Sequence, residues 1–144
     1  MIPEFQGEYR WLSNFAPAQV VFRGITYPSV EHAYMSAKSA DPDWKAYCSD
    51  RTNTPGDVKR ASRKVQMVEG WDDIKRGVML ECLRSKFSQE PYRSKLLGTG
   101  KLHLQEGNRW GDCYWGVDLR QTPNRGMNVL GQLLMQVREE LRNA

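Results

Sequence analysis

Two side chains with complementary acid–base chemistry, Glu31 and Lys38, stand seven positions apart in a segment with helical periodicity. On a helix they fall within about 20° of each other around the axis and about 10 Å apart along it. Both lie beside Tyr34 at the edge of an apolar stripe, where partial burial moves the pKa values of a carboxylate and an amine toward neutrality. This placement suits acid–base or nucleophilic chemistry. The structural alternative is that Glu31 stabilises the helix N-terminus while the stem of Lys38 covers the core.

A second group of candidate residues lies in the tryptophan-rich segment 106–118, which combines acids, aromatic rings and glycines. Glycines let the backbone approach a ligand, aromatic rings offer stacking surfaces, and carboxylates transfer protons or bind sugar hydroxyls. Clefts for nucleotide-like ligands are commonly lined in this way. An aromatic loop packed over a sheet, with its acids in solvent, is an equally good interpretation. The chemistry-bearing residues of the segment are Glu106, Asp112, Trp115, Gly116 and Asp118.

A third candidate is the motif G-x-N-x-x-G at residues 126–131, before the last apolar stripe of the chain. Free amide groups at a helix start can hold a phosphate, and Arg125 can assist. The motif lacks the preceding strand of a dinucleotide-binding fingerprint and the glycine count of a phosphate loop. We therefore expect Asn128 to act mainly as a helix cap.

The elements that hold these residues are predicted to be mostly helices. A β-rich segment broken by Gly24 predicts a small hairpin over residues 19–27. Ser29 is a good N-cap for a helix that runs to about Ala40, where Asp41-Pro42 stops it. Glu31 and Lys38 are thus expected on one continuous helix.

Further along the chain, residues 43–53 predict at most one helical turn, and residues 102–104 alternate like a strand. The apolar stripe from Trp71 to Phe87, which includes Ile74, is expected to face the core. Starts of four further helices are predicted near Pro55, Asp72, Pro91 and Asn128.

Composition places the chain among globular proteins: 144 residues, 40% hydrophobic and 26% charged, with a net charge of +4. We expect one compact α+β domain over residues 1–144, predominantly helical with a few short strands. No apolar run approaches the roughly 20 residues of a membrane span, and no signal peptide opens the chain, so a cytoplasmic protein is expected. Three cysteines and two histidines lack the spacing of a zinc site, and no metal is expected. The basic residues between positions 59 and 64 are explained most simply as a solvated helix face.

These segments, in this order, resemble the NADAR superfamily, also called the YbiA-like family, over nearly the whole chain. The matching stretches are residues 5–15 with their Leu12-Ser13-Asn14-Phe15 core, residues 27–34 running on to Lys38, Trp71, Lys75 and Met79, Lys86-Phe87, Leu96-Leu97, Thr99-Gly100, Glu106, Asp112-x-x-Trp115-Gly116, and Gly126-x-Asn128-x-Leu130-Gly131 through Leu134-Met135 and Arg138.

The resemblance implies a hydrolase for the N-glycosidic bond between ribose C1 and a base nitrogen, with no cofactor or metal and no obligate protein partner. Some family members hydrolyse early riboflavin-pathway intermediates that carry ribose phosphate. Others remove ADP-ribose from guanine in DNA or RNA (guanine de-ADP-ribosylation). The sequence does not choose between these substrates. Two alternatives stay open, a non-catalytic module that binds ADP-ribose or NAD and a general nucleic-acid-binding domain.

The resemblance also assigns roles to residues. Lys38 matches the proposed nucleophile, which forms a Schiff base with the opened sugar. Glu31 is a candidate acid, base or sugar-hydroxyl anchor, and Asp112 matches an acidic position before the Trp-Gly pair. The amine and the acids are expected to converge on one pocket for a pentose. The residues expected to bind substrate are Asn14, Phe15, Tyr34, Glu106, Trp115, Gly116, Asp118 and Asn128.

Two positions depart from the family pattern. Met35 stands where glutamine is frequent, so a polar ligand contact is expected to be missing there. Val117 follows the Trp-Gly pair where some relatives carry aspartate, and Asp118 comes next. Whether Asp112 or Asp118 faces the ligand therefore stays open.

Overall fold

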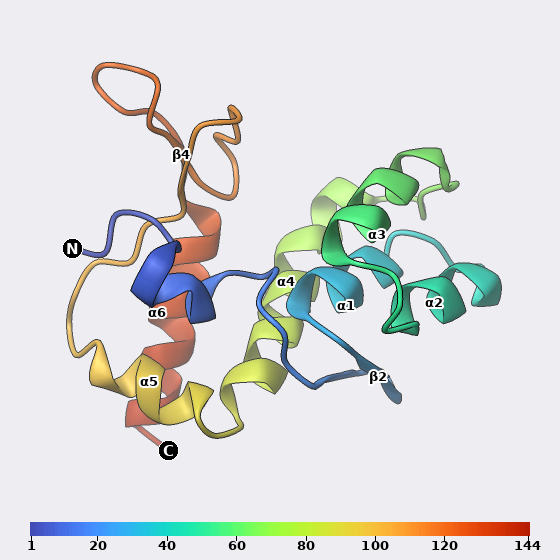
Figure 1. Ribbon diagram of the computed structural model, residues 1–144, viewed down its shortest axis with the longest axis horizontal. Helices are drawn as coiled ribbons and strands as arrows, with labels where there is room; N and C mark the ends of the chain where they lie inside the picture. The colour runs from blue at the N-terminus through green and yellow to red at the C-terminus, as the bar shows by residue number, and fades with distance from the viewer. The chain divides into compact units, whose positions relative to one another are not determined.

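The computed structural model describes residues 1–144 and divides into two compact units (Figure 1). The middle unit is formed by Asn14–Lys86, and the terminal unit combines Met1–Ser13 with Phe87–Ala144. Helices dominate and the strands are short, which confirms the predicted α+β class. That residues 1–144 act as one domain stays a prediction. None of the helices combines the length and the apolar character that crossing a membrane requires.

The elements in chain order are η1 (Gly7–Leu12), β1 (Val20–Phe22), β2 (Ile25–Tyr27), α1 (Val30–Ser36), α2 (Pro42–Ser49), α3 (Pro55–Ala61), η2 (Ser62–Lys64), α4 (Trp71–Phe87), α5 (Tyr92–Gly98), β3 (Gly107–Asn108), β4 (Val117–Asp118) and α6 (Val129–Arg142).

The predicted hairpin is confirmed in the middle unit. Strands β1 and β2 pair antiparallel, with Val20 opposite Tyr27. Arg23 and Gly24 form the turn with φ values of 51° and 85°, a left-handed conformation that glycine adopts readily. Tyr27 is 2% exposed, so the strand leads directly into the core beside α1.

Helix α1 is the centre of the middle unit and packs against α2, α3 and both strands (Figure 1). All of its residues are buried, including Glu31 and His32. As predicted, Ser29 caps it, accepting a hydrogen bond from the backbone N–H of His32 at 3.2 Å. Because a buried polar side chain without a hydrogen-bond partner is costly, Glu31 and His32 must serve either the fold or the binding of a ligand.

The predicted end of α1 is wrong, because the helix stops at Ser36 with Ala37 as its C-cap instead of continuing to Ala40. Other segments take its last carbonyl groups. The indole Nε1 of Trp44 donates to Met35 O at 2.8 Å, and Lys45 Nζ donates to Ser36 O at 3.1 Å. Lys38 therefore follows the helix instead of lying on it.

The loop predicted after this helix is also a correction, since residues 42–49 form α2, with Asp41 as its cap and Pro42 in its first turn. The start of α3 is as predicted, and a capping box joins Thr54 and Asp57. Helix α4 begins at Trp71, but Ile74 is 43% exposed and does not face the core.

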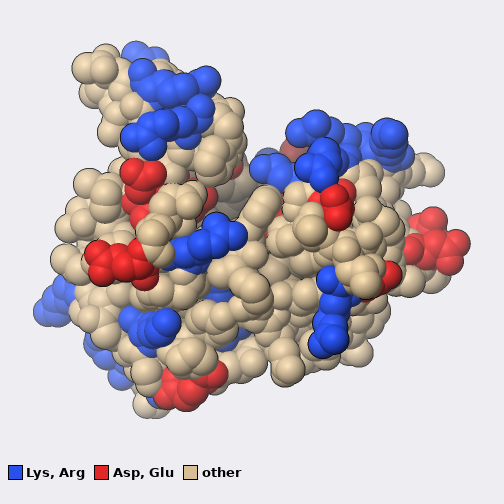
Figure 2. Space-filling model, viewed as in Figure 1, with Lys and Arg blue, Asp and Glu red and all other residues tan.

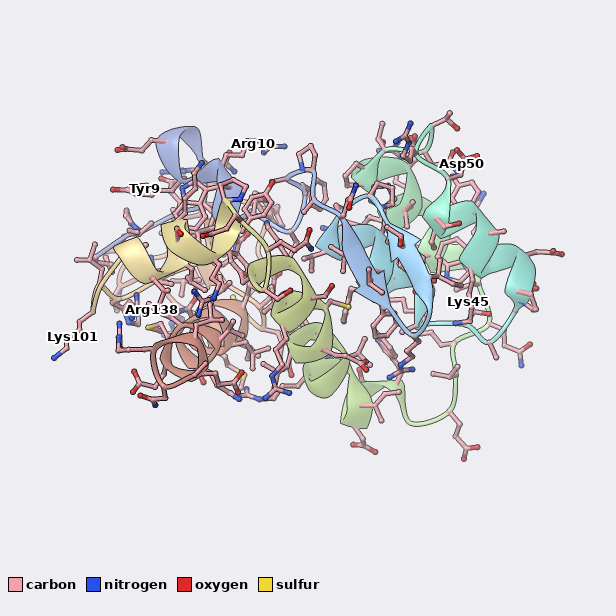
Figure 3. The ribbon with its side chains drawn as sticks, turned by 90° about the horizontal axis from the view of Figure 1, so that it is seen from below. Tyr9, Arg10, Lys45, Asp50, Lys101 and Arg138 are labelled. Carbon is pink, nitrogen blue, oxygen red and sulfur yellow. The ribbon has the colours of Figure 1, made fainter.

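In the terminal unit, α5 packs against α6, which buries its predicted apolar stripe. Arg138 of α6 ties the two together, donating from Nη1 to Thr99 Oγ1 at 2.8 Å and to Leu102 O at 2.9 Å (Figure 3). Strands β3 and β4 pair in parallel. The predicted strand at 102–104 reduces to one bridge between Ile2 and Leu104.

Candidate functional site

The predicted site residues fall into two sets, one in each unit. The set in the middle unit is Asn14, Phe15, Glu31, Tyr34 and Lys38. The set in the terminal unit is Glu106, Asp112, Trp115, Gly116, Asp118 and Asn128.

Lys38 lies in the turn after α1 with its side chain half-buried. Its Nζ donates to Ser62 Oγ at 3.5 Å. Burial lowers the pKa of Lys38, because a low-dielectric setting disfavours the charged amine. The negative charge of Glu31 opposes this shift. Three cations lower the pKa further, namely Lys59, Lys75 and Arg63. The combination favours an amine that can lose its proton and act as a nucleophile.

Glu31 is 6% exposed and occupies the first turn of α1. Its backbone N–H donates to Asn14 O at 3.1 Å, which joins the helix start to the segment that carries Asn14 and Phe15. Asn14 Nδ2 donates to Met79 Sδ at 3.5 Å, while its Oδ1 is buried and has no hydrogen-bond donor. Such an acceptor is uncommon in folded proteins, which supports Asn14 as a ligand residue.

His32 belongs to the stretch that resembles the family but had no predicted role, and it fixes the first turn of α1. Its ring joins Ser29 Oγ at 2.6 Å through Nδ1 and Asn53 O at 2.7 Å through Nε2. Because a carbonyl only accepts, Nε2 carries the proton and Nδ1 accepts from Ser29. Burial lowers the pKa of His32, so the neutral ring is favoured. These two hydrogen bonds fix the turn that also carries the neighbouring residue, Glu31.

The two aromatic residues of the middle set differ in exposure. Tyr34 is 4% exposed and its ring packs against that of Trp71 at a centroid distance of 5.3 Å. Phe15 is half-buried, with Lys59 Nζ 5.8 Å from its ring centroid. Phe15 is therefore the more accessible of the two candidate ligand residues, and both assignments stay predictions.

A second amine with a lowered pKa belongs to Lys86, near the end of α4. Its side chain is fully buried, and burial lowers its pKa to about 7. Lys38 is the better candidate nucleophile because it is only half-buried. The sequence analysis counted Lys86 in the family resemblance but gave it no role.

In the terminal unit, Asn108 organises the tryptophan-rich segment, and the sequence analysis missed it. Its Nδ2 donates to Asp112 O at 2.9 Å and its Oδ1 accepts from Asp112 N at 3.0 Å. Gly116 lies so close to Glu106 O that a Cβ atom would collide with it. Glycine is thus required here for backbone packing, whatever its role toward a ligand.

The two aspartates left open by the sequence differ in how their carboxylates are engaged. Asp118 is 2% exposed and both of its oxygens accept from the guanidinium of Arg120 at 3.0 Å. These hydrogen bonds hold its pKa well below the usual range. Asp112 Oδ1 accepts from the backbone N–H groups of Tyr114 and Trp115 at 3.0 and 2.9 Å. Asp118 is committed to Arg120, which favours Asp112 as the ligand residue.

Asn128 precedes α6 with a φ of 52°, and its side chain makes no cap, contrary to the prediction. Instead its Oδ1 accepts from Glu106 N at 2.9 Å and its Nδ2 donates to Leu104 O at 2.9 Å. The amide thus anchors the start of α6 to the segment before β3. Binding of substrate by Asn128 stays a prediction.

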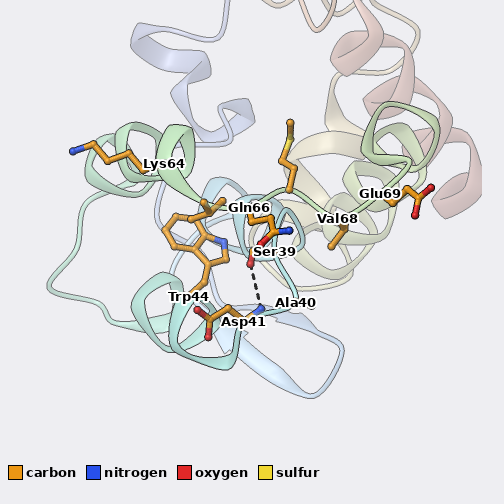
Figure 4. A pocket seen from close by; sticks show the side chains of 10 residues that line it. Ser39, Ala40, Asp41, Trp44, Lys64, Gln66, Val68 and Glu69 are labelled. Atoms are coloured by element: carbon orange, nitrogen blue, oxygen red, sulfur yellow. Dashed lines mark hydrogen bonds between the residues drawn. The ribbon is translucent and has the colours of Figure 1, made fainter.

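A cavity of about 620 Å³ opens in the middle unit next to Lys38 (Figure 4). Its lining includes Ser39, Trp44 and Val68 but neither Lys38 nor Glu31. Ser39 Oγ accepts from Asp41 N at 3.2 Å, and Val68 N donates to Lys38 O at 2.8 Å. We do not assign this cavity to the reaction. No group of three or more His, Cys, Asp or Glu side chains is arranged to hold a metal ion.

Comparison with known proteins gives a consistent match. A family model described as the NADAR domain matches residues 4–142. N-glycosidase YbiA of Escherichia coli is 33% identical over 137 residues, 93% of this chain and 82% of the relative. N-glycosidase Npun_R5314 of Nostoc punctiforme is 32% identical over 140 residues, 94% of this chain and 87% of the relative.

The NMR structure of the E. coli protein YbiA aligns with a TM-score of 0.81 and 30% identity, covering 99% of this chain and 87% of that one. A longer relative, the riboflavin biosynthesis protein VVA0006 of Vibrio vulnificus, is 35% identical over 134 residues. That match takes in 91% of this chain, which spans only 35% of the length of VVA0006.

Proposed function

The chain belongs to the NADAR domain family and is an enzyme of the N-glycosidase class, and we propose that it hydrolyses the bond between C1 of a ribose and a base nitrogen through Lys38. The observation that carries the mechanism is the half-buried amine of Lys38, with a lowered pKa, beside the buried carboxylate of Glu31. Only an unprotonated amine is a nucleophile, and burial lowers the pKa of Lys38 in the direction of that form.

In the proposed reaction, the lone pair of Lys38 Nζ forms a bond to C1 while the bond from C1 to the base nitrogen breaks. The electron pair of that bond leaves with the base, which takes up a proton that the attacking amine loses. The carboxylate of Glu31 is the candidate group to relay this proton or to anchor a sugar hydroxyl. Opening of the ring and loss of the amine proton give a Schiff base. Water then adds to C1, and the free sugar and the amine are released.

For the substrate, we favour an N-ribosyl phosphate intermediate of riboflavin biosynthesis. The relative VVA0006 of Vibrio vulnificus, which is named a riboflavin biosynthesis protein, supports this class. ADP-ribose attached to guanine in nucleic acid is the second candidate, supported by the basic side chains that gather over α3 (Figure 2). Both contain a C1–nitrogen bond, so one mechanism serves either substrate.

The test offers the protein an aminouracil ribosyl phosphate and, separately, ADP-ribosylated guanine DNA, in the presence of sodium borohydride. Borohydride reduces a Schiff base to a stable amine, so mass spectrometry should locate the sugar on the peptide that contains Lys38. Lys38→Ala should remove both the adduct and at least 100-fold of the turnover, on the order expected for loss of a nucleophile.

Lys101→Ala is the matched control, because Lys101 is exposed and should be dispensable (Figure 3). An adduct on Lys86 would assign the nucleophile to that amine instead. Full turnover by Lys38→Ala, with no adduct in the unaltered protein, would contradict the proposed mechanism.

A further inference from the structure

Positive charge surrounds the amine of Lys38 in the middle unit. Lys59 comes from α3, Arg63 from η2 and Lys75 from α4. Each lies close enough to lower the pKa of Lys38 by like-charge repulsion, whereas Glu31 raises it. Three helical elements thus bring cations to the residue that is proposed to react with C1.

Ser62 fixes the position of this amine relative to the basic turn. Its Oγ accepts from Lys38 Nζ at 3.5 Å and donates to Lys59 O at 2.7 Å. Ser62 is 5% exposed and is the first residue of η2, directly before Arg63. The amine of Lys38 therefore lies against the turn from which Lys59 and Arg63 extend.

The cations of this turn are not equally neutralised. Arg60 pairs with Asp57 at 2.6 Å. Lys59 and Arg63 form no ion pair with a carboxylate of the middle unit, and Lys59 Nζ instead lies 5.8 Å from the ring centroid of Phe15. The four basic residues between positions 59 and 64 were expected to form one solvated face. In the structure Arg60 has a local acid, whereas Lys59 and Arg63 lie beside Lys38 without one.

An anion is the ligand that this arrangement fits. A guanidinium binds phosphate through two parallel hydrogen bonds, and an ammonium attracts it as a compact charge. In a ribose 5-phosphate group, the phosphate and C1 are separated by one sugar ring. A phosphate held by Lys59 and Arg63 would therefore leave C1 near the amine that Ser62 positions.

We propose that Lys59 and Arg63 form a subsite for the phosphate of the substrate, which makes the enzyme selective for phosphorylated ribosyl compounds over the corresponding nucleosides. The proposal rests on the proposed function, because it places the phosphate relative to Lys38. It assigns Lys59 and Arg63 to substrate binding and leaves Arg60 outside the subsite.

The test measures binding of ribose 5-phosphate and of ribose by calorimetry in the Lys38→Ala protein, in which no covalent adduct forms. Lys59→Ala and Arg63→Ala should each weaken ribose 5-phosphate binding by about tenfold, the loss of one charge-assisted contact. Binding of ribose should not change. Arg60→Ala is the matched control and should bind ribose 5-phosphate as before.

A parallel experiment uses the protein with Lys38 intact. The ratio of kcat/KM for an aminouracil ribosyl phosphate to that for its dephosphorylated form should fall about tenfold in Lys59→Gln and in Arg63→Gln. An unchanged ratio, together with unchanged ribose 5-phosphate affinity, would overturn the subsite. Turnover retained by Lys38→Ala would overturn the proposed mechanism while leaving the affinity measurements valid, so the two failures are distinguishable.

The last experiment measures binding of unmodified duplex DNA, because its backbone offers the same phosphate chemistry. Binding that falls steeply with salt and is weakened by Lys59→Ala, without any effect on ribose 5-phosphate, would reassign these cations to a nucleic-acid backbone and overturn the proposal. Equal weak DNA binding by all variants would support a subsite for the substrate phosphate.

Discussion

The protonation state of Lys38 sets the pH range in which the proposed reaction can run. Burial and three neighbouring cations lower the pKa of this amine below the usual value of 10.5. The rate should therefore rise with pH as Lys38 loses its proton and level off at a lower pH than an exposed lysine would. A profile of kcat/KM against pH measures the position of this rise.

Replacing a charged neighbour of Lys38 should shift the pH of this rise in a direction set by the charge that is removed. Lys59→Met removes a positive charge, so the pKa of Lys38 should increase and the rise should move to higher pH. Glu31→Gln removes the negative charge and should move it to lower pH. The Lys59 variant also loses the proposed contact with the substrate phosphate at every pH, so the position of the rise, and not its height, reports the change in the pKa of Lys38. Profiles that coincide for all three proteins would show that another group governs the rise.

At the residue scale, the candidate catalytic residues stay predictions, and the structure adds the contacts that surround them. The spacing of Glu31 and Lys38 predicted neighbours on one helix, and the structure keeps them electrostatically coupled although Lys38 follows the helix. The sequence could not separate the roles of Asp112 and Asp118, because only the folded structure shows that the guanidinium of Arg120 binds Asp118. No pattern in the sequence indicated that Ser62 would contact Lys38.

At the scale of elements, the end of α1 depends on a hydrogen bond from another helix. The indole of Trp44 is 7% exposed and donates to Met35 O, a carbonyl in the last turn of α1. Trp44→Phe keeps an aromatic ring but removes the donor. We expect it to lower the free energy of unfolding by about 0.5–1.5 kcal/mol, the net contribution of one hydrogen bond, because Met35 O keeps the backbone N–H of Lys38 as a donor at 3.1 Å. Urea unfolding measures this change.

The same variant should also lower kcat, since Met35 O accepts both from the indole of Trp44 and from the backbone N–H of Lys38 at 3.1 Å. Trp110→Phe is the control, because Trp110 is 58% exposed. It should match the unaltered protein in both measurements. Equal stability of the Trp44 and Trp110 variants would mean that the hydrogen bond does not hold the end of α1.

Local signals predicted the starts of elements, and tertiary partners decided their ends. Ser29 and Thr54 cap helices as expected, since a cap needs only the next few residues. Helix α1 ends early because Trp44 and Lys45 donate to its last carbonyl groups and Val68 N donates to the carbonyl of Lys38. A local sequence pattern does not show any of these tertiary contacts. Helix α2 did have a local start signal, since Asp41 caps it and Pro42 lies in its first turn, but the sequence analysis used this pair only as the stop of the preceding helix.

At the scale of the whole molecule, the terminal unit closes on itself through the first residues of the chain. Ile2 N donates to His103 O at 2.9 Å, Gln105 N donates to Ile2 O at 2.9 Å, and Gly107 N donates to Pro3 O at 3.1 Å. The family model spans residues 4–142 and therefore both units. Sequence periodicity did not predict this closure, because the pairing joins segments about 100 residues apart.

The closure predicts that a change near the N-terminus weakens structure near the C-terminus. Phe5 is 1% exposed, so Phe5→Ala should lower the free energy of unfolding by about 3–5 kcal/mol, the usual cost of emptying a buried aromatic site. Val21→Ala is the control, because Val21 is 58% exposed. Hydrogen exchange in Phe5→Ala should accelerate in α5 and α6 as well as in residues 1–13, since the terminal unit is one compact body. Acceleration confined to residues 1–13 would mean that the N-terminal segment is an appendage and that α5 and α6 are held together by their own contacts, such as those of Arg138.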